Sequence, residues 1–219
     1  MIRGAIFDLD GTLLDSTPYW DRAPEVYLAG LGKRAKSDLA RTIFPMTMPE
    51  AADYMIAEYA LAQSQRQVVD GVNAAMKEFY LHDVPLKPGV TALLDALRER
   101  GVPLMVASVT DKRLVEAVLT RFDVLRRFRG VVTVAEVGVG KQEPDVYLAA
   151  AERLGCASAE TLVFEDALHA LRTAKRAGFR TVGVRDAGGG VPQDALRAEA
   201  EFYLPDYSDC TAILAALAD

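Results

Sequence analysis

The sequence has little of what marks a disulfide-rich, zinc-binding or membrane-spanning protein. Its 219 residues include only two cysteines, Cys156 and Cys210, whose wide separation fits neither a disulfide framework nor a zinc motif. No apolar run reaches membrane-spanning length, and the short apolar stretch after Met1 ends at aspartates instead of continuing as a signal peptide would. We therefore expect a cytoplasmic protein that does not associate with membranes.

Positive charge is also in short supply. The chain has 25 Lys and Arg residues against 31 Asp and Glu residues, a formal net charge of -6. Non-specific binding to nucleic acid or to an anionic membrane requires a basic surface, so we expect neither partner. An anionic ligand must then be attracted by charges placed locally. The sequence indicates no particular oligomeric state, and a monomer is one open alternative.

Most of the chain shows alternating strand and helix patterns. Amphipathic helical patterns lie between short apolar runs that are typical of buried parallel strands. This alternation predicts an α/β fold with a Rossmann-like parallel sheet core. The predicted strands are residues 2–7, 102–107, 131–134, 161–164 and 181–184.

One long segment breaks this alternation. Residues 18–81 show helical patterns and charge clusters but no convincing strand, which predicts an inserted α-helical cap domain. Prolines at Pro18 and Pro85 restrict the residues before them to extended conformations, as expected of linkers. We place the α/β core at residues 1–15 and 84–219 and the cap at residues 16–83.

Polar side chains follow four of the predicted strands. In open parallel sheets ligands bind beyond the carboxyl ends of the strands, so these positions are candidates for a site. Because side chains alternate along an extended chain, Asp8 and Asp10 point the same way while Leu9 turns into the fold. The candidates are Asp8, Asp10, Ser108, Lys141, Glu165 and Asp166.

These residue types suit phosphoryl transfer. Carboxylates from two strand ends offer the hard oxygen ligands that Mg²⁺ prefers. A metal ion and a lysine neutralise phosphoryl oxygens that otherwise repel an attacking carboxylate, and a carboxylate nucleophile divides hydrolysis into two easier displacements. The pattern predicts a Mg²⁺-dependent enzyme acting on a small phosphorylated metabolite.

Four segments in order resemble the motifs of the haloacid dehalogenase superfamily, in its phosphatase and phosphoglucomutase-like branch with a helical cap. They are FDLDGTLLDS, VASVTD, GKQEPDVYLAA and LVFEDALHALRTAKRAG, and the resemblance covers roughly residues 1–15 and 84–210. It departs from the family at KQEPD, where KPxPD is common, and at Ala167 and Ala170, where the family commonly has serine and glycine. Neither departure removes a group needed for the chemistry.

The resemblance implies a role for each candidate. Asp8 is the expected nucleophile and a metal ligand, and Asp10 the expected general acid and base, with its backbone carbonyl on the metal. Asp166 is expected to bind the metal directly, and Glu165 through water or as a variable ligand. The expected phosphate-binding residues are Leu9, Ser108, Val109 and Lys141.

Several alternatives stay open at this stage. Thr110 competes with Ser108 for the phosphate, and Glu165 could instead stabilise the N-terminus of the next helix. Asp10 favours phosphate over halide chemistry, because the superfamily's dehalogenases lack it. A β-phosphoglucomutase-like phosphomutase is the alternative activity, ranked second because Asp111 stands where such mutases carry a lysine. A noncatalytic phosphate-binding module is a remote third.

Overall fold

The computed structural model describes residues 1–44, 46–188 and 192–217. The chain forms two compact units. The first comprises Met1–Thr17 together with the chain from Pro85 onward, and the second is Pro18–Val84.

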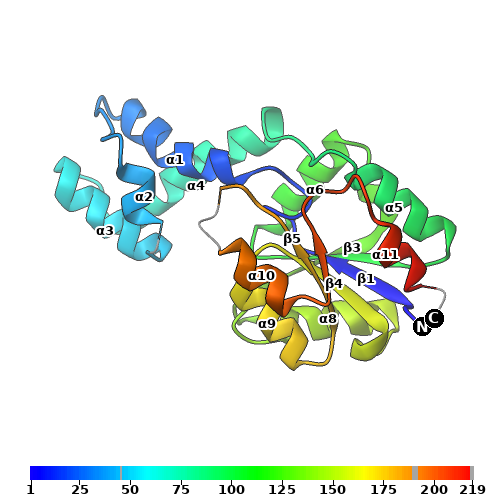
Figure 1. Cartoon of the computed structure of the whole chain (residues 1–219). Helices are drawn as coiled ribbons and strands as arrows, with labels where there is room; N and C mark the ends of the chain where they lie inside the picture. Colours follow the sequence, from blue (N-terminus) through cyan, green and yellow to red (C-terminus); the bar gives the residue numbers. More distant parts are fainter. Residues whose placement is uncertain (45, 189–191, 218–219) are drawn as a thin grey trace. The chain divides into compact units, whose positions relative to one another are not determined.

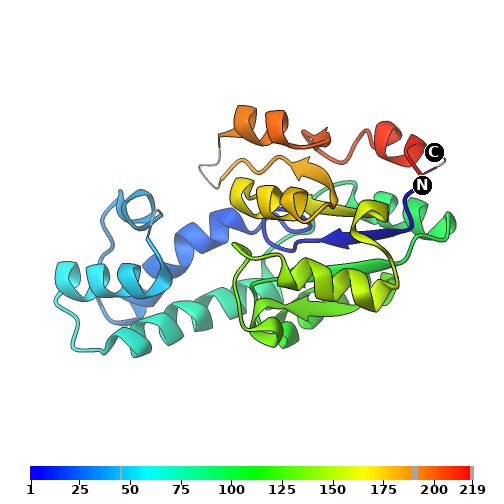
Figure 2. The ribbon, with the colours of Figure 1, turned by 90° about the horizontal axis from the view of Figure 1, so that it is seen from below.

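The first unit is built on a parallel sheet of six strands in the order β3-β2-β1-β4-β5-β6 (Figure 2). This confirms the predicted Rossmann-like α/β fold. The apolar runs become strands because their side chains are buried on both faces. The strands are β1 (Gly4–Phe7), β2 (Leu104–Ser108), β3 (Phe128–Thr133), β4 (Thr161–Glu165), β5 (Arg180–Val184) and β6 (Phe202–Leu204).

Helices cover both faces of this sheet. Helices α5 (Val90–Glu99) and α6 (Lys112–Arg121) lie on one face, and α8 (Asp145–Leu154), α9 (Leu168–Arg176) and α10 (Gln193–Glu199) on the other (Figure 1). Each buries an apolar stripe, as Leu93, Leu94 and Leu97 do in α5. Shorter elements complete the unit: α7 (Val134–Val137), α11 (Thr211–Ala215) and the 3-10 turns Leu125–Arg127 and Ser158–Glu160.

The two segments that connect the first unit to the inserted one pair with each other inside the first unit. Asp15 N donates to Pro85 O at 3.0 Å, and Lys87 N donates to Leu13 O at 2.9 Å. Leu14 and Leu86 form an antiparallel bridge between these hydrogen bonds. The chain therefore leaves and re-enters this unit at adjacent points.

The second unit consists of helices, as the sequence predicts for the inserted segment. Helix α1 (Thr17–Gly30) begins at the last residue of the first unit. It is followed by α2 (Leu39–Ile43), α3 (Met48–Tyr59) and α4 (Gln65–His82). Capping boxes start α3 (Thr47 with Glu50) and α4 (Ser64 with Gln67), so both helices begin where the chain itself satisfies free N–H groups. Every helix in the described part of the chain is too short or too polar to cross a bilayer.

Candidate active site

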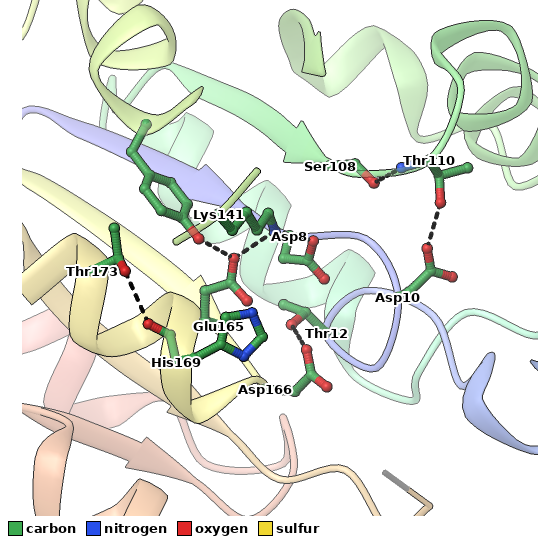
Figure 3. Close-up of polar contacts among 11 residues, drawn as sticks. Asp8, Asp10, Thr12, Ser108, Thr110, Lys141, Glu165, Asp166, His169 and Thr173 are labelled. Atoms are coloured by element: carbon green, nitrogen blue, oxygen red, sulfur yellow. Dashed lines mark hydrogen bonds and ion pairs between the residues drawn. The ribbon is translucent and has the colours of Figure 1, made fainter. Parts of the chain in front are cut away.

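The carboxyl ends of three adjacent strands bring the predicted residues together. Asp8 follows β1, Ser108 ends β2 and Glu165 ends β4, and β1 lies between the other two strands. The order of strands reverses at β1 and β4, the point where open α/β sheets leave a crevice for ligands. Figure 3 shows these side chains with Lys141 and Asp166 at one edge of the sheet.

A buried lysine joins two of the acids. Lys141 Nζ forms ion pairs with Asp8 Oδ1 and, at 2.6 Å, with Glu165 Oε1. The same Glu165 oxygen accepts a hydrogen bond of 2.6 Å from the hydroxyl of Tyr147, a fully buried residue of α8. The side chain of Glu165 is therefore turned toward Lys141, and helix α9 begins without a side-chain cap. The lysine and the tyrosine together fix the orientation of this carboxylate.

Three carboxylates lie close enough to share one cation. Ligand oxygens of Asp8, Glu165 and Asp166 all lie within 4.8 Å of one another. Thr12 Oγ1 donates to Asp166 Oδ1 at 3.2 Å, which orients the third acid. Gly11 has φ of 75°, and a Cβ there would lie 2.4 Å from Asp166 Oδ2. Only glycine lets the chain turn this close to the carboxylate.

The electrostatics of the cluster show a shortage of positive charge. Burial raises the pKa of Asp8 well above its ordinary value; Lys141 opposes this shift, and the other carboxylates add to it. Burial also raises the pKa of Asp166 to about 7, helped by the charges of Glu165 and Asp186. Burial alone lowers the pKa of Lys141, but Asp8 and Glu165 outweigh it and keep the lysine charged. One lysine does not neutralise three acids, so the cluster favours a bound cation.

A second group of residues lies beside the cluster. Thr110 Oγ1 donates to Asp10 Oδ2 at 2.8 Å, and Thr110 N donates to Ser108 Oγ at 3.0 Å (Figure 3). Ser108 is fully buried, whereas Val109, which follows it, is exposed. Leu9 is buried between the two aspartates, as the alternation of side chains predicts. Ser108 and Thr110 thus play different parts in one network, with Thr110 fixing Asp10.

Two polar partners in the cluster were not predicted from the sequence. Tyr147 is fully buried in its helix, and a buried tyrosine hydroxyl needs a hydrogen-bond partner, which Glu165 provides. Thr12 follows Gly11 in the first motif and orients Asp166. His169, by contrast, offers its backbone carbonyl to Thr173 Oγ1 at 3.1 Å, as expected of a structural helix residue.

Comparison with known proteins identifies the family of this chain. The family model for haloacid dehalogenase-like hydrolases matches residues 2–178 of this chain. Hexitol phosphatase B of Escherichia coli strain K12 is 31% identical over 189 residues, covering 84% of this chain and 83% of that protein. A phosphorylated carbohydrates phosphatase of Thermotoga maritima is 27% identical over 181 residues, covering 83% of this chain and 84% of that one.

Solved structures share the fold. A structure from Thermotoga maritima described as a candidate β-phosphoglucomutase superposes with a TM-score of 0.85 at 25% identity, covering 98% of this chain and 99% of that one. CbbY from Rhodobacter sphaeroides has a TM-score of 0.80 at 22% identity, covering 96% and 97%. The resemblance predicted from the four motifs is confirmed, and the chain belongs to the haloacid dehalogenase-like hydrolase family.

Proposed function

We propose that this chain is a Mg²⁺-dependent phosphatase that hydrolyses the phosphate monoester of a small metabolite, with a sugar or sugar-alcohol phosphate as the leading substrate class and a nucleotide as the other. The observation that carries the proposal is the cluster of Asp8, Glu165 and Asp166, of which Asp8 and Glu165 are buried and paired with Lys141. The substrate class follows the phosphatases of hexitols and phosphorylated carbohydrates to which the chain is similar.

The donor set of the cluster fits Mg²⁺. Asp8 and Asp166 offer carboxylate oxygens, the ligand type that a hard cation prefers, and the backbone carbonyl of Asp10 would add a third. Glu165 keeps Oε1 on Lys141 and Tyr147, so we assign it to the second coordination sphere. When bound, the ion supplies positive charge to the phosphoryl oxygens and to the surrounding acids.

Asp8 is proposed as the nucleophile. Its carboxylate oxygen forms a bond to phosphorus while the ester P–O bond breaks, and Asp10 gives a proton to the leaving alcohol. Water then attacks the aspartyl phosphate, Asp10 takes its proton, and the bond between Asp8 and phosphorus breaks. Asp8 must be ionised to attack, and because burial raises its pKa, the charge of Lys141 is needed to keep it so.

The other residues position the phosphate. Lys141 neutralises the phosphoryl group, and Ser108 with the backbone N–H groups of Leu9 and Val109 would hold its oxygens. Thr110 donates to Asp10, which holds that carboxylate in one orientation for both proton transfers. We further propose that the first unit is the catalytic core and that the helical unit acts as a cap that selects the substrate.

Phosphate release from sugar phosphates, nucleotides and p-nitrophenyl phosphate tests the proposal. We expect activity with Mg²⁺, none with a chelator, and a loss of at least about a thousandfold in Asp8→Asn and Asp10→Asn, since each removes a group that acts in the transition state. Asp194→Asn, at an exposed position of α10, is the matched control and should keep full activity. Activity that persists in the presence of a chelator or in Asp8→Asn would contradict the proposed mechanism.

A phosphomutase is the second candidate, favoured by a basic cavity in the helical unit. Its volume is about 920 Å³, and Lys33, Arg34, Lys36 and Arg41 are among its lining residues. Cations on a cap could hold the second phosphate of a bisphosphate. Against this, Asp111 only caps α6, with its side chain accepting from Arg113 N. Phosphate transfer within one sugar phosphate that depends on added bisphosphate would favour the mutase.

A further inference from the structure

A buried carboxylate outside the proposed catalytic cluster joins three segments of the first unit. Asp186 lies just past β5, and its side chain is only 2% exposed. Its Oδ2 accepts a hydrogen bond of 2.6 Å from Thr17 Oγ1, and its Oδ1 lies 3.2 Å from Lys87 Nζ. Lys87 Nζ also donates to Arg185 O at 2.7 Å. One acid thus binds both the segment that leaves this unit and the segment that returns to it.

Those two segments already form a pair. The backbone hydrogen bonds of Asp15 with Pro85 and of Lys87 with Leu13 join them. Asp186 attaches the pair to the end of the sheet at β5. Because breaking one partner of a buried ion pair leaves the other charge unpaired, this attachment resists movement of either linker.

Asp186 and Gly188 make two further contacts that bear on this attachment. Gln193 Nε2 donates to Asp186 O at 3.1 Å, and Tyr203 Oη donates to Gln193 Oε1 at 3.2 Å. Gly188 packs against the other side of Thr17, where a Cβ would lie 2.3 Å from Thr17 Cγ2. Thr17, where the outgoing segment ends, therefore contacts both the carboxylate of Asp186 and the backbone at Gly188.

The segment that ends at Thr17 continues directly from the loop that carries Asp8 and Asp10. Gly11 N donates to Leu14 O at 3.0 Å, and Asp10 forms a bridge with Leu14. Tyr207 Oη donates to Thr12 O at 3.0 Å, which anchors the same loop from the opposite direction. The contact between Asp186 and Thr17 thus lies between the loop that carries Asp8 and Asp10 and helix α1, which begins at Thr17.

We propose that Asp186 is a positioning residue that fixes the base of both cap linkers and so sets how the cap opens and closes, while phosphoryl transfer itself proceeds without it. The inference rests on the proposed function. In enzymes with closing lids, hinge residues far from the chemistry alter kcat and KM together. Asp186, Thr17 and Lys87 hold such a position in this chain.

Amide hydrogen exchange tests the anchor without any substrate. In Asp186→Asn, Thr17→Val and Lys87→Met, we expect exchange in residues 13–18 and 84–88 to accelerate about tenfold or more, since each change breaks a buried contact, while exchange in β1 and β4 stays unchanged. Asp206→Asn, at an exposed acid shortly after β6, should leave exchange in both linkers at the wild-type rate. Linker exchange at the wild-type rate in all three variants would overturn the inference, and so would equal acceleration in the sheet.

A double substitution and a kinetic comparison complete the test. Thr17→Val added to Asp186→Asn should accelerate exchange by less than about twofold further, because both remove the same contact. In Thr17→Val, which removes the contact but leaves the charge of Asp186 near Asp166 in place, we expect kcat/KM for a sugar phosphate to fall about tenfold relative to kcat/KM for p-nitrophenyl phosphate, whose hydrolysis reports the chemistry with few cap contacts. An equal fall for both substrates would contradict a positioning role. Should the wild-type chain hydrolyse neither, the proposed function fails, and the exchange result still decides the anchor.

Discussion

At the scale of single residues, the site is defined by buried acids that one lysine does not neutralise. Asp8, Glu165 and Asp166 would be solvated if they were ordinary turn residues, yet Asp8 and Glu165 are almost fully buried and share Lys141. Burying charge in this way costs stability unless a cation compensates it. The cost indicates that the arrangement serves chemistry and not folding.

The hydroxyl of Tyr147 gives the first prediction. Tyr147→Phe keeps the ring in the core but removes the hydrogen bond to Glu165 Oε1. We expect kcat to fall about three- to tenfold and unfolding free energy to fall by about 1 kcal/mol, the usual net value of one such bond. Steady-state kinetics and denaturant unfolding measure both. Thr161→Val, which loses a hydrogen bond to Ala157 O at the opposite end of β4 from Glu165, should reduce stability alone; an equal effect on kcat would refute the role of Tyr147.

Asp166 gives a prediction about pH. Its folded-state pKa is about 7 against an ordinary value of 3.8, so between these pH values the folded protein holds a proton that the unfolded chain has released. The unfolding free energy of the metal-free protein should therefore fall as pH rises from about 4 to about 7, by on the order of 4 kcal/mol from this group. Thermal unfolding in chelator from pH 4.5 to 8 measures the slope.

The matched variant for that experiment is Asp166→Asn. It removes the titrating group and should flatten the fall, leaving the metal-free variant more stable than the wild type near pH 8. Mg²⁺ requires ionised ligands, so its affinity for the wild type should rise as pH increases through about 7. Parallel curves for the two proteins would show that Asp166 does not carry the pH dependence.

At the scale of elements, the strands that could be predicted were those buried on both faces. Residues 4–7 and residues 162–164 could be predicted as strands because each is an uninterrupted apolar run that ends at an acid. Strand β6 was missed because it has only three residues, lies at the sheet edge and is half-buried. Val134 was predicted to end a strand but starts α7, since an apolar residue fits both elements at their junction.

The residues of the candidate site also divide into those that could be predicted from the sequence and those that could not. Asp8, Lys141 and Asp166 could be predicted because they stand at strand ends or in ordered motifs. The partners Tyr147 and Thr12 could not be placed, because their contacts join residues 18 and 154 positions apart. Asp186 was missed for the same reason, since its partners Thr17 and Lys87 are distant in sequence.

Capping of α4 gives a prediction at this scale. Ser64 accepts from Gln67 N, and the side chain of Gln67 accepts from Ser64 N at 2.9 Å. Ser64→Ala should destabilise the helical unit by about 1 kcal/mol, the usual cost of losing an N-cap. Hydrogen exchange within residues 65–82 reports it, and Ser64→Asp, which retains an acceptor, should restore most of the protection. Uniform acceleration over the sheet would argue against a local effect.

At the scale of the whole molecule, the chain consists of two units with separate cores. Leu28, Met55 and Val68 are among the buried residues of the helical unit, and Ile6 and Val163 belong to the core of the other. Every member of the acidic cluster lies in the first unit. Ligands of this cluster should accordingly stabilise one unit directly.

Mg²⁺ binding tests that separation. At 100 times its dissociation constant, Mg²⁺ should stabilise the first unit by about 2.7 kcal/mol, and Asp8→Asn should lose most of this effect. Hydrogen exchange with and without Mg²⁺ locates the change: we expect slower exchange in the loops after β1 and β4 and no change in α3. Protection confined to the helical unit would mean that the ion binds elsewhere.

The paired linkers carry a consequence for how this architecture diversifies. Asp15 and Pro85 are joined by a backbone hydrogen bond of 3.0 Å, so the outgoing and returning segments are paired where the insertion begins and ends. Residues 18–84 therefore form a cassette that can be lengthened, shortened or exchanged without reshaping β1 or the loop that bears the nucleophile. Since we propose that the helical unit selects the substrate, a graft at these two positions is expected to retain the reaction and change only the substrate.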